Sequence, residues 1–274
     1  MNQLLKEKIE GIAPLLSDLE RRTYFNLHQY RYLHTLSELQ LLCKSGKVLD
    51  VGIAPGHMAM ALSRLGYEVS GVSYDPDSNF ADYKDKTTLR ERLAAEDIVV
   101  KKCDIQSEPL PFEDNTFDII LFTEILEHLE QFPNMILKEI NRVLNKKNGY
   151  LILTTPNASH LSNRLKFMLG HNIYTSVETM CSLPIYKRHN REYTMEELKR
   201  LLKYTNFEVI KSKYESYYFR TTKLKEEVDG LTLISPNLSF KYLKSYLKLF
   251  SWPLVTMCPS LKPNLFVIAK VAQI

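Results

Sequence analysis

The chain has 274 residues, 45% hydrophobic and 25% charged, so it can bury a sizeable core as one large domain or as one domain with an appendage. Its net charge of +4 is too small to indicate a nucleic-acid-binding protein and is compatible with an anionic small substrate. Four widely spaced cysteines form no C-x-x-C pair, which favours reduced thiols over a zinc site or a disulfide framework. We expect a cytoplasmic protein, because no stretch suits a signal peptide or a membrane span.

Residues 1–45 are predicted to form an N-terminal helical lead-in, because their apolar side chains recur at helical spacing. This segment either packs over the site or covers an edge of the sheet. We expect residues 46–274 to form one domain with two inserts on the substrate side, 157–192 and 214–262. The second insert includes a predicted basic amphipathic helix, 240–250, which would either pack on the sheet or rest on a membrane surface.

Seven short apolar segments are predicted to be strands. Helical patterns separate the first five, and this alternation predicts a parallel, right-handed, doubly wound sheet. A capping box, Thr194 with Glu197, predicts the start of a helix that continues to Lys203. The predicted strands are Val48–Val51, Glu68–Ser73, Ile98–Cys103, Phe117–Phe122, Gly149–Thr154, Phe207–Ser212 and Leu265–Val271.

The first strand leads into a turn of small residues, and an apolar helical pattern follows at once. The turn includes Gly52, Ala54 and Gly56, with Asp50 just before it. Strand, tight turn and helix form the opening unit of a doubly wound fold. Glycine lets the backbone approach a ligand closely there, next to the positive end of the helix.

Later segments agree with this turn in order and spacing. Together they resemble the class I S-adenosylmethionine-dependent methyltransferases over about residues 45–212. The resemblance implies a Rossmann-like α/β fold: a seven-stranded doubly wound sheet with the last strand antiparallel, N-terminal helices, and a C-terminal insert acting as a lid. It also implies S-adenosyl-L-methionine as the cofactor. The segments that carry it are Gly52–Gly56, Ser73–Pro76, Cys103–Ile105, Leu110–Asp118 and Thr123–Leu129.

The resemblance implies which residues face the methionine part of the cofactor. The turn of Gly52, Ala54 and Gly56 would face it, with Asp50 near its ammonium group. Thr123, at the end of the fourth strand, would lie at the floor of the site.

Five further residues are implied on the adenosine side. The family usually has an acid at the end of the second strand to hold the ribose hydroxyls, but this chain has Ser73 there. Either Ser73 makes a weaker bond or Asp75 substitutes for the acid. Tyr74 would pack on the adenine, and Asp104 would accept from the adenine amino group with the Ile105 backbone beside it.

The chemistry is expected from an E-x-x-E-H run, Glu124, Glu127 and His128, after the fourth strand. On a helical turn these side chains would project to one face. Joined by His189, they resemble the metal site of metal-dependent small-RNA 2'-O-methyltransferases, where a divalent cation could lower the pKa of an acceptor hydroxyl. The alternative is that His128 acts alone as a general base and Glu127 only supports the turn.

The region after the fifth strand resembles bacterial methyltransferases of surface-polysaccharide biosynthesis. That implies a hydroxyl acceptor on a sugar, nucleotide sugar or related phosphorylated metabolite. The residues expected on the substrate side are Arg164, Arg188, Arg191 and Tyr193.

Three other functions remain open from the sequence. An RNA 2'-O-methyltransferase would want a broader basic face, so no stable nucleic-acid partner is expected. A quinone or lipid-linked acceptor would involve at most peripheral membrane contact. A cofactor-binding regulator without turnover is disfavoured by the intact E-x-x-E-H run. The oligomeric state is left open.

Overall fold

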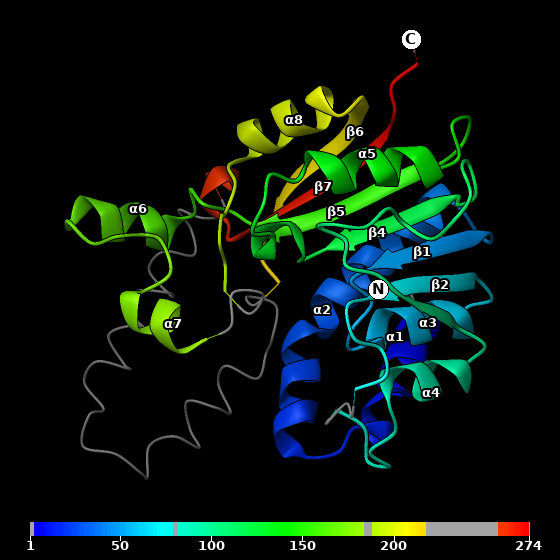
Figure 1. The fold of residues 1–274 in the computed structure, drawn as a ribbon. Coiled ribbons are helices and arrows are strands. Elements are labelled where there is room, and N and C mark those ends of the chain that lie inside the picture. Colours follow the sequence, from blue (N-terminus) through cyan, green and yellow to red (C-terminus); the bar gives the residue numbers. More distant parts are fainter. Residues whose placement is uncertain (1–2, 79–81, 184–187, 218–256, 274) are drawn as a thin grey trace.

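The seven predicted strands pair into one sheet in the order β3-β2-β1-β4-β5-β7-β6 (Figure 1). The computed structural model describes residues 3–78, 82–183, 188–217 and 257–273. The strand bounds are β1 Lys47–Val51, β2 Glu68–Ser73, β3 Val99–Lys102, β4 Ile119–Thr123, β5 Tyr150–Pro156, β6 Phe207–Glu215 and β7 Asn264–Val271.

Strands β1 to β5 run parallel, whereas β7 pairs antiparallel with both β5 and β6. The predicted Rossmann-like sheet with an antiparallel last strand is therefore confirmed. Strands β5 and β6 extend beyond their predicted ends because β7 gives the extra residues partners. Pro156 of β5 and Glu215 of β6 both pair with Asn264 of β7. The inner strands are apolar on both faces, as expected where helices cover both sides of a parallel sheet.

Helices cover the two faces of the sheet and bury separate halves of the core (Figure 1). On one side lie α1 (Gln3–Glu10), α2 (Leu19–Leu42), α3 (His57–Arg64) and α4 (Leu89–Ala94), and on the other lie α5 (Asn134–Val143) and α8 (Met195–Tyr204).

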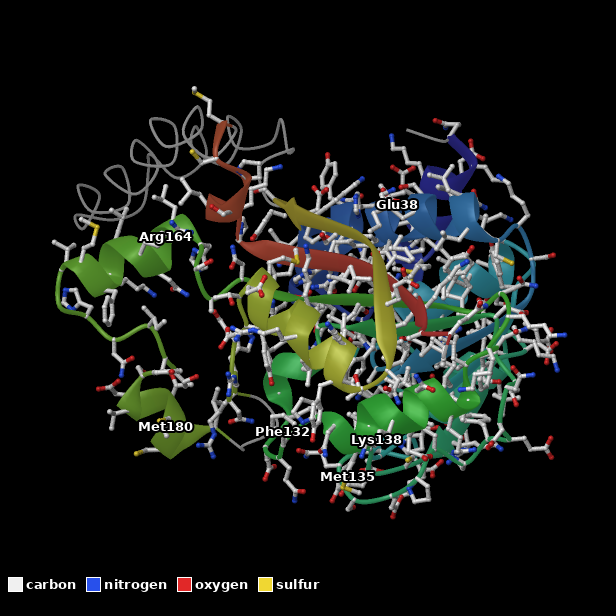
Figure 2. The ribbon with its side chains drawn as sticks, turned by 90° about the horizontal axis from the view of Figure 1, so that it is seen from above. Glu38, Phe132, Met135, Lys138, Arg164 and Met180 are labelled. Carbon is white, nitrogen blue, oxygen red and sulfur yellow. The ribbon has the colours of Figure 1, made fainter. Side chains whose placement is uncertain are left out.

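Helix α8 starts at the predicted capping box of Thr194 and Glu197. The remaining helical segments of the described chain are short. Helices α6 (Leu161–Met168) and α7 (Val177–Ser182) lie beside the sheet, with Arg164 and Met180 at that end of the molecule (Figure 2). Three single 3₁₀ turns are η1 Ala13–Leu15, η2 Leu126–His128 and η6 Pro259–Leu261.

The N-terminal segment is helical, as predicted, and α2 contacts the distant strand β6. Glu38 of α2 is nearly buried, and its carboxylate pairs with Lys211 Nζ at 2.5 Å and Lys213 Nζ at 2.7 Å. The predicted helix 240–250 lies outside the described residues. Every helix within the described ranges is too short or too polar to cross a membrane.

Candidate functional site

A cleft of about 840 Å³ opens at the carboxyl ends of the central strands. Strand order reverses between β1 and β4, and open α/β sheets bind ligands at such a switch point. The volume suits a small-molecule cofactor. The cleft brings together six of the predicted cofactor residues: Gly52, Ser73, Tyr74, Asp75, Asp104 and Ile105.

The turn after β1 has the backbone geometry that glycine provides. Gly52 has φ +78° and Gly56 has φ +87°, both in the left-handed region. A Cβ atom on Gly52 would lie 2.3 Å from Ile125 Cδ1, so no larger residue fits there without displacing Ile125. Gly52 lines the cleft, whereas Ala54 and Gly56 do not.

Asp50 lies directly behind the turn and is buried. Its burial raises the pKa of the carboxyl to about 7. A buried carboxylate is stable only beside a compensating positive charge or donor. Asp50 is therefore suited to an ammonium group such as that of the methionine moiety, and Thr123 at the end of β4 is half-buried nearby in the paired strands.

On the adenosine side both predicted ribose ligands face the cleft. Ser73 is half-buried at the end of β2, and Asp75 is exposed two residues later. Tyr74 is 71% exposed, which leaves its ring free to cover an aromatic ligand. The Asp104 carboxylate accepts from the backbone N–H of Gln106 at 3.1 Å and from Ser107 Oγ at 2.7 Å, which fixes its orientation.

The prediction that Glu124, Glu127 and His128 share one face of a helical turn is wrong. The 3₁₀ turn begins only at Leu126, and Glu124 before it has φ +57°, so its side chain leaves in another direction. The Glu124 carboxylate instead pairs with Arg31 of α2 at 3.0 Å and accepts from Thr154 Oγ1 at 2.8 Å.

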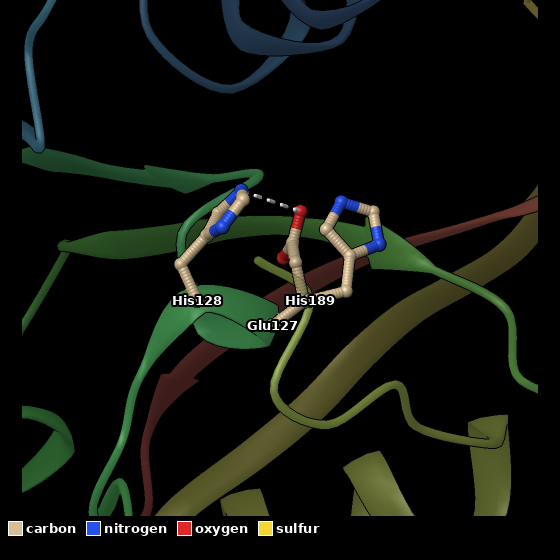
Figure 3. A group of neighbouring side chains, drawn as sticks. All are labelled: Glu127, His128 and His189. Carbon is tan, nitrogen blue, oxygen red and sulfur yellow. Dashed lines mark ion pairs between the residues drawn. The ribbon is translucent and has the colours of Figure 1, made fainter. Parts of the chain in front are cut away.

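Three of the four predicted metal ligands do converge. One ligand atom each from Glu127, His128 and His189 lie within 4.8 Å of one another. Figure 3 shows Glu127 between the two imidazole rings, with His128 Nε2 3.9 Å from Glu127 Oε1. Glu127 is 1% exposed and accepts from Thr155 Oγ1 at 3.0 Å.

Each imidazole of this group has its Nδ1 atom engaged. His128 Nδ1 lies 2.9 Å from the backbone oxygen of Arg188, and His189 Nδ1 lies 3.0 Å from Glu192 Oε1. Both acceptors hold the proton on Nδ1 and leave Nε2 free. Histidines that bind metals are held in this way, so the donor set fits a divalent cation as well as a general base.

Burial and neighbouring groups shift the pKa values of Glu127, His128 and His189 in different directions. Burial, and then repulsion by Glu124, raise the pKa of Glu127. Burial, and then the neighbouring His189, lower the pKa of His128. The hydrogen bond to Glu192 raises the pKa of His189. The lowered pKa makes His128 more readily neutral than His189, and the neutral imidazole is the form that can accept a proton.

A second cavity, of about 750 Å³, has His189 of this group in its lining, whereas His128 lines the cofactor cleft. The ring centroids of the two histidines are 5.0 Å apart, so the group borders both spaces. The second cavity is lined mainly by polar residues: Tyr174, Thr175, Ser176, Thr179, Arg188, His189, Asn190, Arg191, Glu192 and Glu197, with Ala158 and Ile173.

The predicted substrate residues are only partly gathered in this cavity. Arg188 and Arg191 line it. The Arg188 Nε atom is buried and has no hydrogen-bond partner among the described residues. Tyr193 is buried under the Arg191 guanidinium, and Arg164 instead donates to the Ser159 backbone oxygen at 2.6 Å, outside the cavity lining.

Two residues at the site were missed from the sequence. Arg31 reaches Glu124 from α2, and no motif in the helical lead-in distinguishes it. Glu192 holds His189, and its i,i+3 spacing from that histidine was the available signal.

The sheet, the turn at its switch point and the flanking cleft define a Rossmann-like protein that binds a nucleoside-type cofactor. Residues 21–212 match the family described as "Methyltransferase domain". This match covers more than half of the chain, which therefore belongs to the S-adenosylmethionine-dependent methyltransferases.

Individual curated relatives match this chain over only part of its length. The mitochondrial ubiquinone biosynthesis O-methyltransferase of Schizosaccharomyces pombe is 27% identical over 132 residues, which cover 48% of this chain and 46% of that protein. The 23S rRNA (uracil(747)-C(5))-methyltransferase of Pyrococcus horikoshii is 30% identical over 175 residues, 64% of this chain and 36% of that protein. The chain thus spans about half the length, or less, of these curated relatives.

Solved structures share the fold at low identity. The phosphoethanolamine N-methyltransferase 2 of Haemonchus contortus, solved in complex with S-adenosyl-L-methionine, aligns with a TM-score of 0.53. It is 19% identical, and the alignment covers 88% of this chain and 52% of that one. This likeness supports the fold alone.

Proposed function

We propose that this chain transfers a methyl group from S-adenosyl-L-methionine to a hydroxyl group of a polar acceptor bound in the second cavity. The acceptor class is a sugar, a nucleotide sugar or a related phosphorylated metabolite. The observation that carries the proposal is the position of Glu127, His128 and His189 between the two cavities. A methyl donor on one side and an acceptor on the other would meet at this group.

The residues of the cleft would divide the work of holding the cofactor. Asp50 and the turn at Gly52 would receive the methionine part, Ser73 or Asp75 the ribose, and Asp104 the adenine. When bound, the cofactor supplies an electrophilic methyl group on a sulfonium. The chain then orients an acceptor oxygen in line with that methyl group and removes the hydroxyl proton.

His128 is the residue we assign to proton removal. Its Nδ1 is engaged by the Arg188 backbone oxygen, which leaves Nε2 free, and burial favours the neutral imidazole by lowering its pKa. Glu127, His128 and His189 would alternatively hold a divalent cation, which when bound lowers the pKa of a ligated hydroxyl. Glu124 is left out of this ligand set, because its carboxylate is engaged by Arg31 and Thr154.

The lining of the second cavity supports a polar, anionic acceptor. Hydroxyl and amide side chains outnumber apolar ones, and the guanidinium of Arg188 brings positive charge that suits a phosphate or carboxylate. The sequence resemblance to methyltransferases of surface-polysaccharide biosynthesis supports the same acceptor class. A quinone acceptor is the second candidate, since a relative acts in ubiquinone biosynthesis, but only Ala158 and Ile173 in this lining have wholly apolar side chains.

A screen of acceptors tests the proposal. The protein is incubated with radiolabelled S-adenosyl-L-methionine and with nucleotide sugars, quinone precursors or small RNAs, each with and without divalent cations. We expect label transfer to a nucleotide sugar or a sugar phosphate. Labelling of only quinone precursors or only RNA would contradict the acceptor class while leaving methyl transfer intact.

Chelation separates the two versions of the chemistry. If a cation is held by Glu127, His128 and His189, excess EDTA is expected to remove methyl transfer, and added divalent metal should restore it. Elemental analysis should then find metal in the wild type and less in Glu127→Gln. Full activity in excess EDTA, with no metal detected, would leave His128 as a plain general base.

The raised pKa of Asp50 predicts a pH dependence of cofactor binding. The carboxyl is mostly protonated below about pH 7 in the free protein, and a nearby ammonium would favour its ionised form. Binding at pH 6 should therefore release a proton, and the affinity should rise with pH by up to about tenfold per unit below pH 7.

Calorimetry at pH 6 in two buffers of different ionisation enthalpy measures the released proton directly. Asp50→Asn should bind more weakly and release none. Equal heats in both buffers for the wild type would exclude the pairing of Asp50 with the ammonium.

A further inference from the structure

His189 is positioned by backbone contacts although it lies on a loop. Its side chain is 42% exposed, so packing alone does not fix the ring. The residue after it is bonded to the 3₁₀ turn η2. The Asn190 backbone N–H donates to the backbone oxygen of Glu127 at 2.7 Å, and Asn190 Nδ2 donates to the backbone oxygen of His128 at 2.8 Å. Thr175 Oγ1 donates to the His189 oxygen at 2.8 Å. These bonds place the Cα of His189 and leave its ring to be oriented separately.

Glu192 supplies that orientation. Its Oε1 lies 3.0 Å from His189 Nδ1, and a carboxylate can only accept, so Nδ1 must carry the proton. The Nε2 lone pair then remains available. The other oxygen, Oε2, accepts from Asn163 Nδ2 at 3.4 Å, and the same Nδ2 donates to the Ala158 oxygen at 3.0 Å. Asn163 is 5% exposed on α6, so the carboxylate is held from behind by a buried amide.

We propose that Glu192 is a positioning residue that holds His189 as its Nδ1–H tautomer, so that the Nε2 lone pair is available to the acceptor hydroxyl or to a divalent cation shared with Glu127 and His128. This role rests on the proposed function, because it assumes that His189 takes part in methyl transfer. A carboxylate behind a working histidine acts in the same sense in hydrolases and in metal sites, where its removal costs about 10–100-fold in activity or metal affinity.

Two variants of Glu192 and one matched surface variant test the proposal. Glu192→Ala is expected to lower kcat about 10–100-fold with little change in the KM for S-adenosyl-L-methionine. Glu192→Gln should not recover the loss, because its oxygen would accept from Asn163 Nδ2 and its NH2 group would then face His189 Nδ1 and favour the other tautomer. Glu196→Ala, at an exposed glutamate of α8, should behave as wild type. In a His189→Ala background, Glu192→Ala should cause no further loss.

A readout that needs no acceptor keeps this test separate from that of the function. NMR of ¹⁵N-labelled histidine reports which ring nitrogen of His189 carries the proton. We expect the Nδ1–H tautomer in the wild type, a shift to the Nε2–H tautomer in Glu192→Gln, and a mixture of tautomers in Glu192→Ala, with unchanged cofactor affinity in both variants. An unchanged tautomer in Glu192→Ala, or an equal loss of activity in the His189→Ala background, would overturn the positioning role. Failure of every acceptor in the screen would instead count against the function alone.

Discussion

Gly52→Val is expected to abolish binding of S-adenosyl-L-methionine. The position has φ +78°, where a β-branched residue is strained, and its Cβ would lie 2.3 Å from Ile125 Cδ1. The remaining methyl groups would enter the cleft that the turn lines. Calorimetric titration with the cofactor should show no measurable heat at concentrations where the wild type saturates.

Gly66→Val is the matched control for this loss. Gly66 has φ +90°, so the backbone strain is comparable, but a Cβ there would meet nothing within 4 Å. We expect it to lose stability and to retain cofactor affinity. Wild-type affinity in Gly52→Val would show that the turn does not contact the cofactor, and loss of affinity in both variants would point to a general effect of strain.

His128→Ala is expected to lower kcat by about 10²–10⁴-fold while leaving cofactor affinity within a few-fold of wild type. The reason is that His128 lines the cofactor cleft next to His189, has its Nε2 atom free, and has a lowered pKa that favours the neutral imidazole. The measurement is single-turnover methyl transfer to the acceptor found by screening, with saturating cofactor.

His171→Ala is the control, because His171 is an exposed histidine of the loop after α6, outside the Glu127–His128–His189 group. It should retain wild-type turnover. If His128→Ala also retained turnover, proton removal would have to be reassigned within the group, first to Glu127 or His189.

The positions of the strands along the chain were predictable from the sequence, because parallel strands buried on both faces appear as continuous apolar runs. The cofactor turn was predictable for a related reason: only small residues tolerate its dihedral angles, so Gly52 and Gly56 are visible in the chain itself. Thr194 and Glu197 likewise encode a helix start within four residues.

The arrangement of Glu127, His128 and His189 was harder to predict because it depends on contacts between distant segments. Spacing alone placed Glu124 with Glu127, but Glu124 has a left-handed backbone conformation and its carboxylate forms an ion pair with Arg31. The approach of His189 to Glu127 depends on a loop that follows two further helices. The second cavity is lined by residues of several separate segments, so its lining could not be assembled from local patterns.

The position of β7 bears on how the fold is reached. β6 is held in the sheet through β7, although β7 follows it in the chain by 48 intervening residues, 216–263. β6 cannot pair until the chain between the two strands has brought them together, and the entropy lost in closing so long a connection must precede any gain from the contacts it allows. Lys211 and Lys213 lie on β6, so the salt bridges that join them to Glu38 of α2 also form late. We therefore expect the half of the sheet that binds the cofactor to become ordered before the edge strand and its contact with the N-terminal helix.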